Sequence, residues 1–397
     1  MSMVDVLNGN QAAARGAALS RPDVVAAYPI TPQTPLVEYL TQFVANGELE
    51  AFMSEVESEH SAMSVVTGAS LAGSRTFTAT SSQGLALMYE PYFRASTLRL
   101  PVVMAIVNRE MISPQTVWGG PQDSMTLRDA GWIQIYVEDN QEILDMIIQA
   151  YKIGEDSRVL LPVNICYDGF YLSHLTERVE IPEQDLVDKF LPDYAPTHIK
   201  LDPQKPMAVD PLTTGDLLME YREKHMQAQQ NALKVIQEVN DDFADTFGRN
   251  HFGLLEKYRC DDADVILISL GSMTGAAREA VDYHRDKGLA VGLLKIRSLR
   301  PFPHQEVSEV LSGRQAIGVV DRNVSFGWNT GILYQEIRSA LYEKEKPVPI
   351  LPFIGGLGGE DLRIEAFIYC IEKLKEARGK EQKNFPKTCW LNKKGVK

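Results

Sequence analysis

The chain has 397 residues, 44% of them hydrophobic, and a formal net charge of −13 at pH 7. This length exceeds what one ordinary core accommodates, so two or three domains are expected. The acidic balance disfavours nucleic acid and anionic membranes as partners, and no apolar run approaches the roughly 18–20 residues of a membrane span.

The first part of the chain alternates short apolar runs with helical patterns. Strands are predicted at 24–27, 76–80, 101–107, 133–137 and 159–165, and helices from about residue 34, at 59–72, after 84 and at 141–154. This alternation is typical of a parallel sheet covered by helices on both faces. Residues 1–178 are therefore predicted to form one α/β domain.

A different pattern follows at residues 179–260. The proline-rich stretch at 180–211 predicts an extended segment that crosses a surface. Residues 213–247 have apolar side chains near helical spacing among many charges, which favours a linker helix with a solvated face over a partner-binding helix.

A second α/β domain is predicted at 261–378, with strands at 264–270, 290–295, 315–321 and 349–353. Gly271–Gly275 opens a helix and could bind an anion, but it lacks the G-x-G-x-x-G pattern, and a structural turn is favoured. Residues 379–397 form a basic, weakly patterned tail that is expected to be flexible or to lie on a neighbour. The predicted fold class is thus α/β with two doubly wound domains.

The four cysteines are widely spaced, with no C-x-x-C motif: Cys166, Cys260, Cys370 and Cys389. An iron–sulfur cluster or a structural zinc site needs clustered thiolates, so neither is expected in this chain, and the scattered histidines suggest no other metal site. Sparse, unpaired cysteines fit a reducing cytosol, and residues 1–10 lack a signal-peptide pattern. A cytoplasmic location is predicted.

The most distinctive motif, Tyr28–Pro35 (YPITPQTP), directly follows the first predicted strand. Its prolines fix the backbone, and Thr31 or Thr34 could cap the helix that follows. Ligands of open α/β sheets bind at the carboxyl ends of strands, so the Thr31 hydroxyl could instead meet a substrate.

Three further segments carry candidate groups. Glu59 stands at the start of a helix rich in small residues, where a glutamate usually interacts with the helix dipole, although it could also bind a cofactor ring nitrogen. The small residues of Thr78–Leu85 (TATSSQGL) would let a ligand approach the backbone. Arg109 follows a buried strand and could bind a carboxylate bidentately or pair with Glu110 or Asp123.

Several enzyme motifs are missing from the sequence. It contains no G-x-S-x-G, H-E-x-x-H, P-loop or Rossmann fingerprint. The G-D-G…N-N motif that binds metal and diphosphate in thiamine enzymes is missing too, and Gly215-Asp216-Leu217 is only a superficial match.

Taken together, the segments resemble the alpha subunit of the 2-oxoacid:ferredoxin oxidoreductases, of which pyruvate:ferredoxin oxidoreductase is the best-known member. The resemblance covers nearly the whole chain, and its segments PITP and SEH are the most specific. The matching segments are AAYPITPQTPLVEYL, EVESEHSAMS, RTFTATSSQGLALM, LPVVMAIVNRE, DSMTLRDAGWIQ, LPVNICYDGF, KIRSLRPFP, VVDRNVSFG and GGLGGEDL. The resemblance implies a pyrimidine-side thiamine-enzyme domain followed by a domain similar to the transketolase C-terminal domain.

The resemblance also implies cofactors and partners. Thiamine diphosphate would lie between this chain and a beta subunit that supplies the Mg²⁺/diphosphate motif and a 4Fe–4S cluster. A gamma subunit and a ferredoxin-like subunit would complete the complex, with a flavin/NAD subunit as a further option. The implied reaction converts a 2-oxoacid and coenzyme A to an acyl-CoA and CO₂, with electrons leaving through the partner clusters to ferredoxin or another acceptor.

Residue roles follow from the resemblance at matching positions. Glu59 matches the glutamate that bonds N1′ of the cofactor aminopyrimidine, Arg109 the arginine that binds the substrate carboxylate, and Thr31 the threonine that contacts the 2-oxoacid. The remaining cofactor-side candidates are Tyr28, Pro29 and Ile30, which would shape the pocket wall, together with Ser82 and Gln83.

The loop after Arg109 departs from the family pattern. Pyruvate enzymes usually have R-A-L-S-A-P-I-N-I-W followed by D-H-x-D, whereas this chain has Gly119-Gly120-Pro121 and then Gln122 in place of the histidine. Trp118 beside two glycines predicts a roomier, aromatic-lined pocket, with Trp118 and Asp123 as substrate contacts. An aryl 2-oxoacid, as in an NAD-linked phenylglyoxylate dehydrogenase, is therefore an alternative to pyruvate. Oxalate is disfavoured, because oxalate enzymes have arginine where Thr31 stands.

Two rival functions differ in what they require. A non-catalytic scaffold subunit would keep the fold but lose the cofactor contacts, so the joint presence of Glu59, Arg109 and Thr31 argues against it. A free-standing thiamine decarboxylase would need the diphosphate motif that this sequence lacks.

Overall fold

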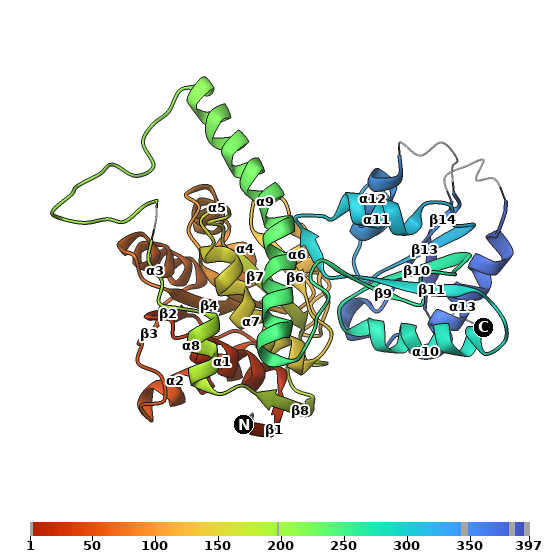
Figure 1. Cartoon of the computed structure of the whole chain (residues 1–397), viewed down its shortest axis with the longest axis horizontal. Coiled ribbons are helices and arrows are strands. Elements are labelled where there is room, and N and C mark those ends of the chain that lie inside the picture. Colours follow the sequence, from red (N-terminus) through yellow and green to blue (C-terminus); the bar gives the residue numbers. More distant parts are fainter. Residues whose placement is uncertain (1–2, 197, 343–347, 381–385, 393–397) are drawn as a thin grey trace.

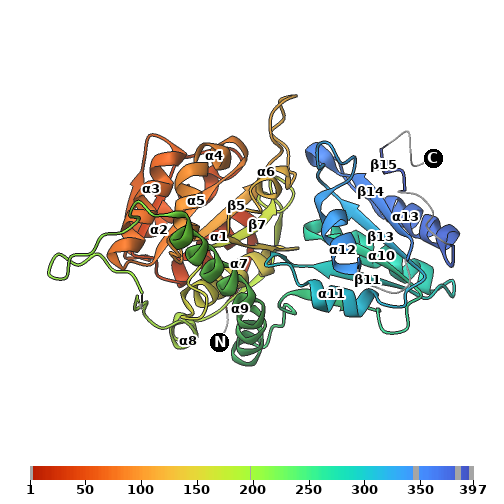
Figure 2. The same ribbon diagram turned by 90° about the horizontal axis from the view of Figure 1, so that it is seen from above.

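The computed structural model describes residues 3–196, 198–342, 348–380 and 386–392. Two α/β units lie next to each other in both views, and the long helix α9 (Gly215–Phe247) precedes the second of them in the chain (Figures 1 and 2). Each unit has a mainly parallel sheet between helices, which confirms the predicted fold class.

The first unit is built on a seven-stranded sheet with the order β12-β6-β7-β5-β4-β2-β3. All neighbouring strands run parallel except β12, which is antiparallel to β6. The strands are β2 (Val24–Ala27), β3 (Phe52–Glu55), β4 (Thr76–Thr80), β5 (Val103–Asn108), β6 (Ile133–Tyr136), β7 (Val163–Asp168) and β12 (Ser298–Arg300).

Two apolar cores cover the faces of this sheet. The first core includes side chains of α1 (Gly9–Leu19), α2 (Thr34–Ala45) and α7 (Asn140–Glu155). The second includes side chains of α3 (Glu59–Ala72), α4 (Ser82–Leu87), α5 (Tyr89–Thr97) and α6 (Gln122–Thr126), and it continues into the second unit. The first unit therefore shares one of its cores with the second.

The helix α9 has two parts with different surroundings. From His225 onward it carries buried residues at helical spacing and packs on α7, α8 and α5; these residues include His225, Ala228, Ala232, Val235, Val239 and Phe243. Residues 215–224 are exposed and extend beyond the body of the first unit (Figure 1). Among the described residues, no helix combines the length and apolar character required to cross a membrane.

The second unit is built on a six-stranded sheet with the order β15-β14-β13-β10-β11-β9, in which only β9 is antiparallel. Helices α10 and α13 pack together, as do α11 and α12. The strands are β9 (Leu255–Tyr258), β10 (Val265–Leu270), β11 (Val291–Ile296), β13 (Ala316–Asp321), β14 (Ile350–Gly355) and β15 (Cys389–Leu391). The helices are η1 (Gly271–Met273), α10 (Thr274–Arg285), α11 (His304–Leu311), α12 (Ile332–Leu341), η2 (Leu357–Gly359) and α13 (Ile364–Ala377).

Three segments differ from their predicted structure. β7 begins at Val163 instead of residue 159, because Leu160 adopts a left-handed φ of 47° that interrupts an extended strand. The predicted extended segment begins with α8 (Gln184–Phe190), whose Val187 and Phe190 are buried, and follows β8 (Thr176–Ile181), which pairs with β1 (Met3–Asn8). Within the predicted tail, β15 pairs with β14 because Leu391 is buried against Gly355, whereas residues 381–385 and 393–397 lie outside the described residues.

Two strands connect segments on opposite sides of the predicted boundaries. β9 lies within 179–260 yet pairs with β11 of the second sheet, and β12 lies within 261–378 yet pairs with β6 of the first sheet. The division of the chain at these boundaries remains a prediction, and the two units exchange strands across it.

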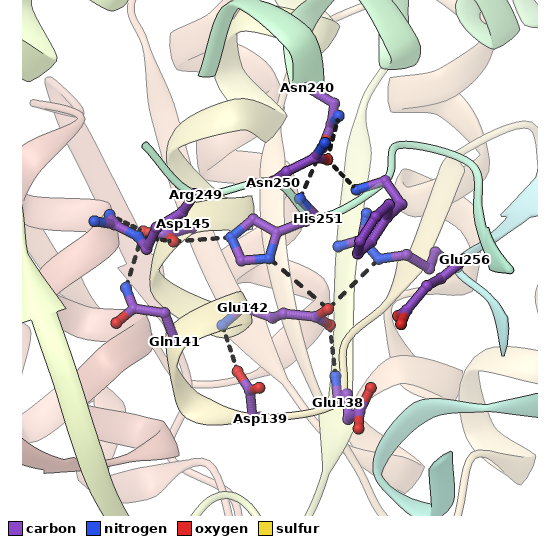
Figure 3. Close-up of polar contacts among 12 residues, drawn as sticks. Glu138, Asp139, Gln141, Glu142, Asp145, Asn240, Arg249, Asn250, His251 and Glu256 are labelled. Atoms are coloured by element: carbon purple, nitrogen blue, oxygen red, sulfur yellow. Dashed lines mark hydrogen bonds and ion pairs between the residues drawn. The ribbon is translucent and has the colours of Figure 1, made fainter. Parts of the chain in front are cut away.

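A buried ion-pair network joins the units, and several of its acidic members come from the segment around the start of α7 (Figure 3). Lys295 of β11 is 2% exposed, and its Nζ lies 2.6 Å from Glu142 and 2.7 Å from Glu138. Arg297 is fully buried, with Nε 3.7 Å from Glu142. Although burial alone would raise it, these positive charges hold the pKa of Glu142 well below its ordinary value.

Candidate active site

The predicted site residues gather at one edge of the first sheet. β5, β4 and β2 are neighbours and run parallel, so the loops that begin at Tyr28, Ser81 and Arg109 leave their strands at the same edge. This is the edge at which open α/β sheets bind their ligands.

Glu59 is the first residue of α3 and is 5% exposed. Ser58 caps the helix by accepting a hydrogen bond from the Ser61 N–H at 3.2 Å, so Glu59 is not needed as the cap. A Cβ at Gly84 would lie 2.5 Å from Glu59 Oε1, so the glycine allows α4 to approach the carboxyl. Burial raises the pKa of Glu59, and its own backbone N–H opposes the shift. A buried carboxyl with a raised pKa fits a proton-sharing role.

Unpaired polar atoms occur in the segment that approaches Glu59. Thr80 Oγ1 and Gln83 Oε1 are buried and have no hydrogen-bond partner within the described ranges, and a Cβ at Gly84 would lie 2.5 Å from Thr80 Oγ1 as well. Buried polar groups are normally satisfied, because an unmade bond costs about 1–3 kcal/mol. The neighbouring Glu59 carboxyl and Thr80 hydroxyl are therefore suited to a polar ring such as an aminopyrimidine.

Arg109 is 6% exposed and directs its guanidinium to backbone carbonyls. Nη1 donates to the Thr31 carbonyl at 3.0 Å and Nε to the Thr116 carbonyl at 3.2 Å. No carboxylate of the described chain lies within ion-pair distance of the guanidinium, so the alternative pairing with Glu110 or Asp123 is wrong. Burial lowers the pKa of Arg109, and the charge of Asp123 opposes this. A buried cation with spare donors is suited to bind an anionic ligand.

The Tyr28–Pro35 loop meets Arg109 through its backbone. Thr31 is exposed and contributes its carbonyl, while neither threonine caps α2, because Gln33 occupies that position without a side-chain cap bond. Gln33 instead accepts from the Ile30 N–H and donates to the Ala79 carbonyl, both at 3.2 Å. This buried glutamine ties the loop to β4, a role that its position in the motif did not indicate.

Ser82 and Asp123 are buried and bonded to each other behind the site loops. Ser82 is fully buried with a left-handed φ of 47°, and its hydroxyl donates to the Glu110 carbonyl at 2.7 Å. Asp123 is 1% exposed and accepts the N–H groups of Ser82 and Arg109. The structure therefore shows Asp123 bonded to the backbone of two site residues, and its contact with substrate stays a prediction.

Trp118 is 52% exposed and packs on Phe170, with ring centroids 4.8 Å apart. The two glycines beside it lie close to neighbouring atoms. A Cβ at Gly119 would lie 2.4 Å from the Gly169 carbonyl oxygen, and one at Gly120 would lie 2.3 Å from Glu110 Oε1. Both glycines therefore allow close packing at these positions, and the roomier pocket beside Trp118 stays a prediction.

The loop that follows Arg109 is held by contacts from the second unit. The sequence did not predict these contacts. Glu110 Oε1 accepts the Gly358 N–H at 3.2 Å. The Gln122 side chain accepts the Val324 N–H at 2.9 Å and donates to the Val324 carbonyl at 3.1 Å. The one sequence signal for these contacts was the glutamine at position 122, where the family pattern has histidine. In the structure this glutamine contacts the second unit.

The Glu110 carboxyl is expected to make stability depend on pH. Its pKa is raised from 4.5 to about 7, mainly by burial and also by the charge of Asp123, while the Gly358 N–H and Arg322 act in the opposite direction. Because the folded-state pKa is raised, the stabilisation is full below about pH 4.5 and is lost as pH rises through 7. Glu110→Gln is expected to reduce the loss of unfolding free energy between pH 5 and 8.5 by about 2 kcal/mol, measured by denaturant titration. Equal pH dependence in wild type and variant would contradict this, and Glu50→Gln, at an exposed site, is the control.

Comparison with known protein families agrees with this arrangement. Residues 15–241 match the family described as pyruvate flavodoxin/ferredoxin oxidoreductase, thiamine diphosphate-binding. Residues 263–367 match the pyruvate:ferredoxin oxidoreductase core domain II. The first match contains every predicted site residue, and the second contains the loops that dock on the Arg109 loop.

Among solved structures, the chain is similar to 2-oxoglutarate:ferredoxin oxidoreductase from Magnetococcus marinus, with a TM-score of 0.71 and 22% identity over 93% of this chain and 65% of that chain. It is also similar to a split-gene transketolase, with a TM-score of 0.54 and 15% identity over 92% of this chain and 97% of that one. These likenesses show the thiamine-enzyme fold.

Two relatives are far closer in sequence. The chain is 49% identical to the alpha subunit of NADH-dependent phenylglyoxylate dehydrogenase from Aromatoleum evansii, over 91% of this chain and 88% of that protein. It is also 49% identical to pyruvate synthase subunit PorA from Methanocaldococcus jannaschii, over 95% of this chain and 96% of that protein. The chain therefore belongs to the 2-oxoacid:ferredoxin oxidoreductase family, as an alpha subunit of a thiamine-diphosphate-dependent enzyme.

Proposed function

We propose that this subunit seats the carboxylate of a 2-oxoacid on Arg109 and binds the aminopyrimidine of thiamine diphosphate through Glu59. The observation that carries the proposal is the buried Arg109 guanidinium, which has carbonyl partners but no carboxylate partner among the described residues. A substrate carboxylate would provide the missing charge and accept two parallel N–H bonds.

The chemistry of the site divides between the two groups. When bound, thiamine diphosphate supplies a carbon nucleophile for the 2-oxo carbon and accepts the electrons left by loss of CO₂. Glu59 would share a proton with a ring nitrogen of the bound cofactor, and the raised pKa that burial gives this carboxyl suits that role. Thr80 and Gln83 offer polar atoms that orient the ring. Arg109 fixes the direction from which the substrate approaches, because its guanidinium is held by the Thr31 and Thr116 carbonyls.

The remaining parts of the reaction are proposed to lie on partner subunits. The relatives at 49% identity are both named as subunits, which supports assembly with other chains. We propose a beta subunit with the Mg²⁺/diphosphate motif and a 4Fe–4S cluster, gamma and ferredoxin-like subunits, and coenzyme A as acyl acceptor. The cysteines of the described chain are all free, which supports the predicted cytoplasmic location.

Two substrate classes have equal support from the relatives. PorA is named a pyruvate synthase subunit, and the equally similar Aromatoleum protein is named for phenylglyoxylate and NADH. The exposed Trp118, packed on Phe170 close to the Arg109 loop, offers an aromatic surface to either. Pyruvate with ferredoxin is the first proposal, and phenylglyoxylate with NAD is the second.

The native complex, purified with its partner chains, is expected to oxidise at least one 2-oxoacid with CoA. Pyruvate, a branched-chain 2-oxoacid, indolepyruvate and phenylglyoxylate would each be supplied with ferredoxin or with NAD. Released CO₂, acyl-CoA and reduced acceptor would be measured and should appear in fixed proportion. The proposed function fails if thiamine-loaded complex yields none of these products from any of the four acids.

A further inference from the structure

The Asp123 carboxylate, near the start of α6, receives a complete set of hydrogen bonds. Oδ2 accepts the Ser82 N–H at 2.9 Å and the Arg109 N–H at 3.0 Å. Oδ1 accepts Asn108 Nδ2 at 2.7 Å and its neighbour Ser124 N–H at 2.8 Å. With 1% of the residue exposed and four donors in place, the carboxylate has neither surface nor acceptor capacity left for a substrate.

The two donors to Oδ2 belong to two loops with different tasks. The Ser82 loop follows β4 and leads to Gly84, which lies against the Glu59 carboxyl. The Arg109 loop follows β5 and carries the guanidinium. One oxygen atom, Oδ2, therefore holds the backbone on the cofactor side and on the substrate side at once.

The Ser82 loop needs such support. Ser82 adopts a left-handed φ of 47°, a conformation that costs a residue with a Cβ about 1 kcal/mol or more. Two bonds hold it there: its N–H donates to Asp123, and its hydroxyl donates to the Glu110 carbonyl, which belongs to the Arg109 loop. Loss of the hydrogen bonds to Asp123 would therefore loosen the Ser82 and Arg109 loops together.

We infer that Asp123 is a positioning residue that sets the distance between the Arg109 guanidinium and the Glu59 carboxyl. The inference rests on the proposed roles of those two groups. It replaces a predicted substrate contact with an indirect action, through two backbone N–H groups, on both halves of the site.

Asp321 offers a matched control in the second unit. Its carboxylate is 2% exposed and accepts the Leu333 and Tyr334 N–H groups and Asn323 Nδ2, so its bonding closely resembles that of Asp123. Asp123→Asn and Asp321→Asn each turn an amide toward backbone donors, so both should destabilise the chain by similar amounts. Only the first should alter the site.

Asp123→Asn in the assembled complex is expected to lower kcat/KM about 100-fold, with both a lower kcat and a higher KM for the 2-oxoacid, because small displacements of oriented groups are costly. Amide hydrogen exchange should quicken in peptides that contain Ser82 and Arg109. Asp321→Asn should change neither. Asp123→Glu, which keeps the charge and the acceptors, should recover part of the loss and serves if the asparagine variant does not assemble.

Normal kinetics in Asp123→Asn despite faster exchange in both peptides would overturn the inference, as would unchanged exchange. A kinetic loss of equal size in Asp321→Asn would also overturn it, because the effect of Asp123→Asn would then be explained by lower stability alone. Failure of wild-type complex to turn over any 2-oxoacid would instead reject the proposed function, and the exchange result would still report whether Asp123 fixes the two loops.

Discussion

Glu59→Gln is expected to lower kcat by about 1,000-fold in the assembled complex, within the range found when a positioned proton-transfer group is lost. Glutamine has nearly the same shape and fits the space beside Gly84, but it cannot release or share an acidic proton with a ring nitrogen. Binding of thiamine diphosphate should weaken far less than turnover, because the neighbouring Thr80 and Gln83 are unchanged. Steady-state turnover and cofactor titration of the same preparation would measure both quantities.

Glu57 provides a control for this substitution. It lies two residues earlier, is exposed, and hydrogen-bonds with Ser61 on the outside of the helix start. Glu57→Gln is therefore expected to leave turnover within about 2-fold of wild type, since exposed substitutions seldom exceed ±0.5 kcal/mol. Near-normal turnover in Glu59→Gln would show that the assignment of Glu59 is wrong.

Lys295→Met is expected to have the largest effect on stability, a loss of about 3–5 kcal/mol, because it leaves buried carboxylates without their cation. Lys295 Nζ lies within 2.7 Å of both Glu138 and Glu142. Without it, Glu138 would keep its ion pair with Arg278, whereas Glu142 would keep only the more distant Arg297, at 3.7 Å, and His251, at 3.8 Å. Since the network spans both units, denaturant unfolding should show two separate transitions where wild type shows them coupled.

Lys373→Met is the matched control, because Lys373 pairs with the exposed Glu376 on the surface of α13 and such pairs contribute about 0–1 kcal/mol. The double variant Lys295→Met/Glu142→Gln should recover part of the loss, since it removes one unpaired charge. If Lys295→Met matched the control in its unfolding midpoint, the network would not contribute to the cohesion of the units.

The sequence was a good guide to groups at strand ends and a poor one to what supports them. Glu59 could be predicted as a candidate because it stands in a short local motif. Arg109 could be predicted because it directly follows an apolar strand. Asp123 was predicted as a substrate contact from the family resemblance, and local sequence cannot tell whether a carboxylate faces a cavity or backbone N–H groups. That question is decided by the packing of α6 against two loops more than a dozen residues away.

Contacts between the units were beyond the reach of pattern reasoning for a related reason. Gln122 and Val324 are 202 residues apart, and neither belongs to a motif that names its partner. β12 is a three-residue strand with no periodicity to identify it. Alternation of strands and helices predicts that sheets form, but it does not predict which short strand completes which sheet.

The strand β12 makes the two units difficult to separate. A fragment that ended at residue 260 would keep every predicted site residue, but β6 would lose its neighbour and become the edge of the first sheet. An uncovered edge strand presents unpaired N–H and C=O groups that can pair with another molecule, and such fragments tend to aggregate. A gene encoding only the first unit would therefore yield a protein that aggregates through this open edge. In a chimera that combines units from two relatives, residues 298–300 would have to come from the same relative as the first unit.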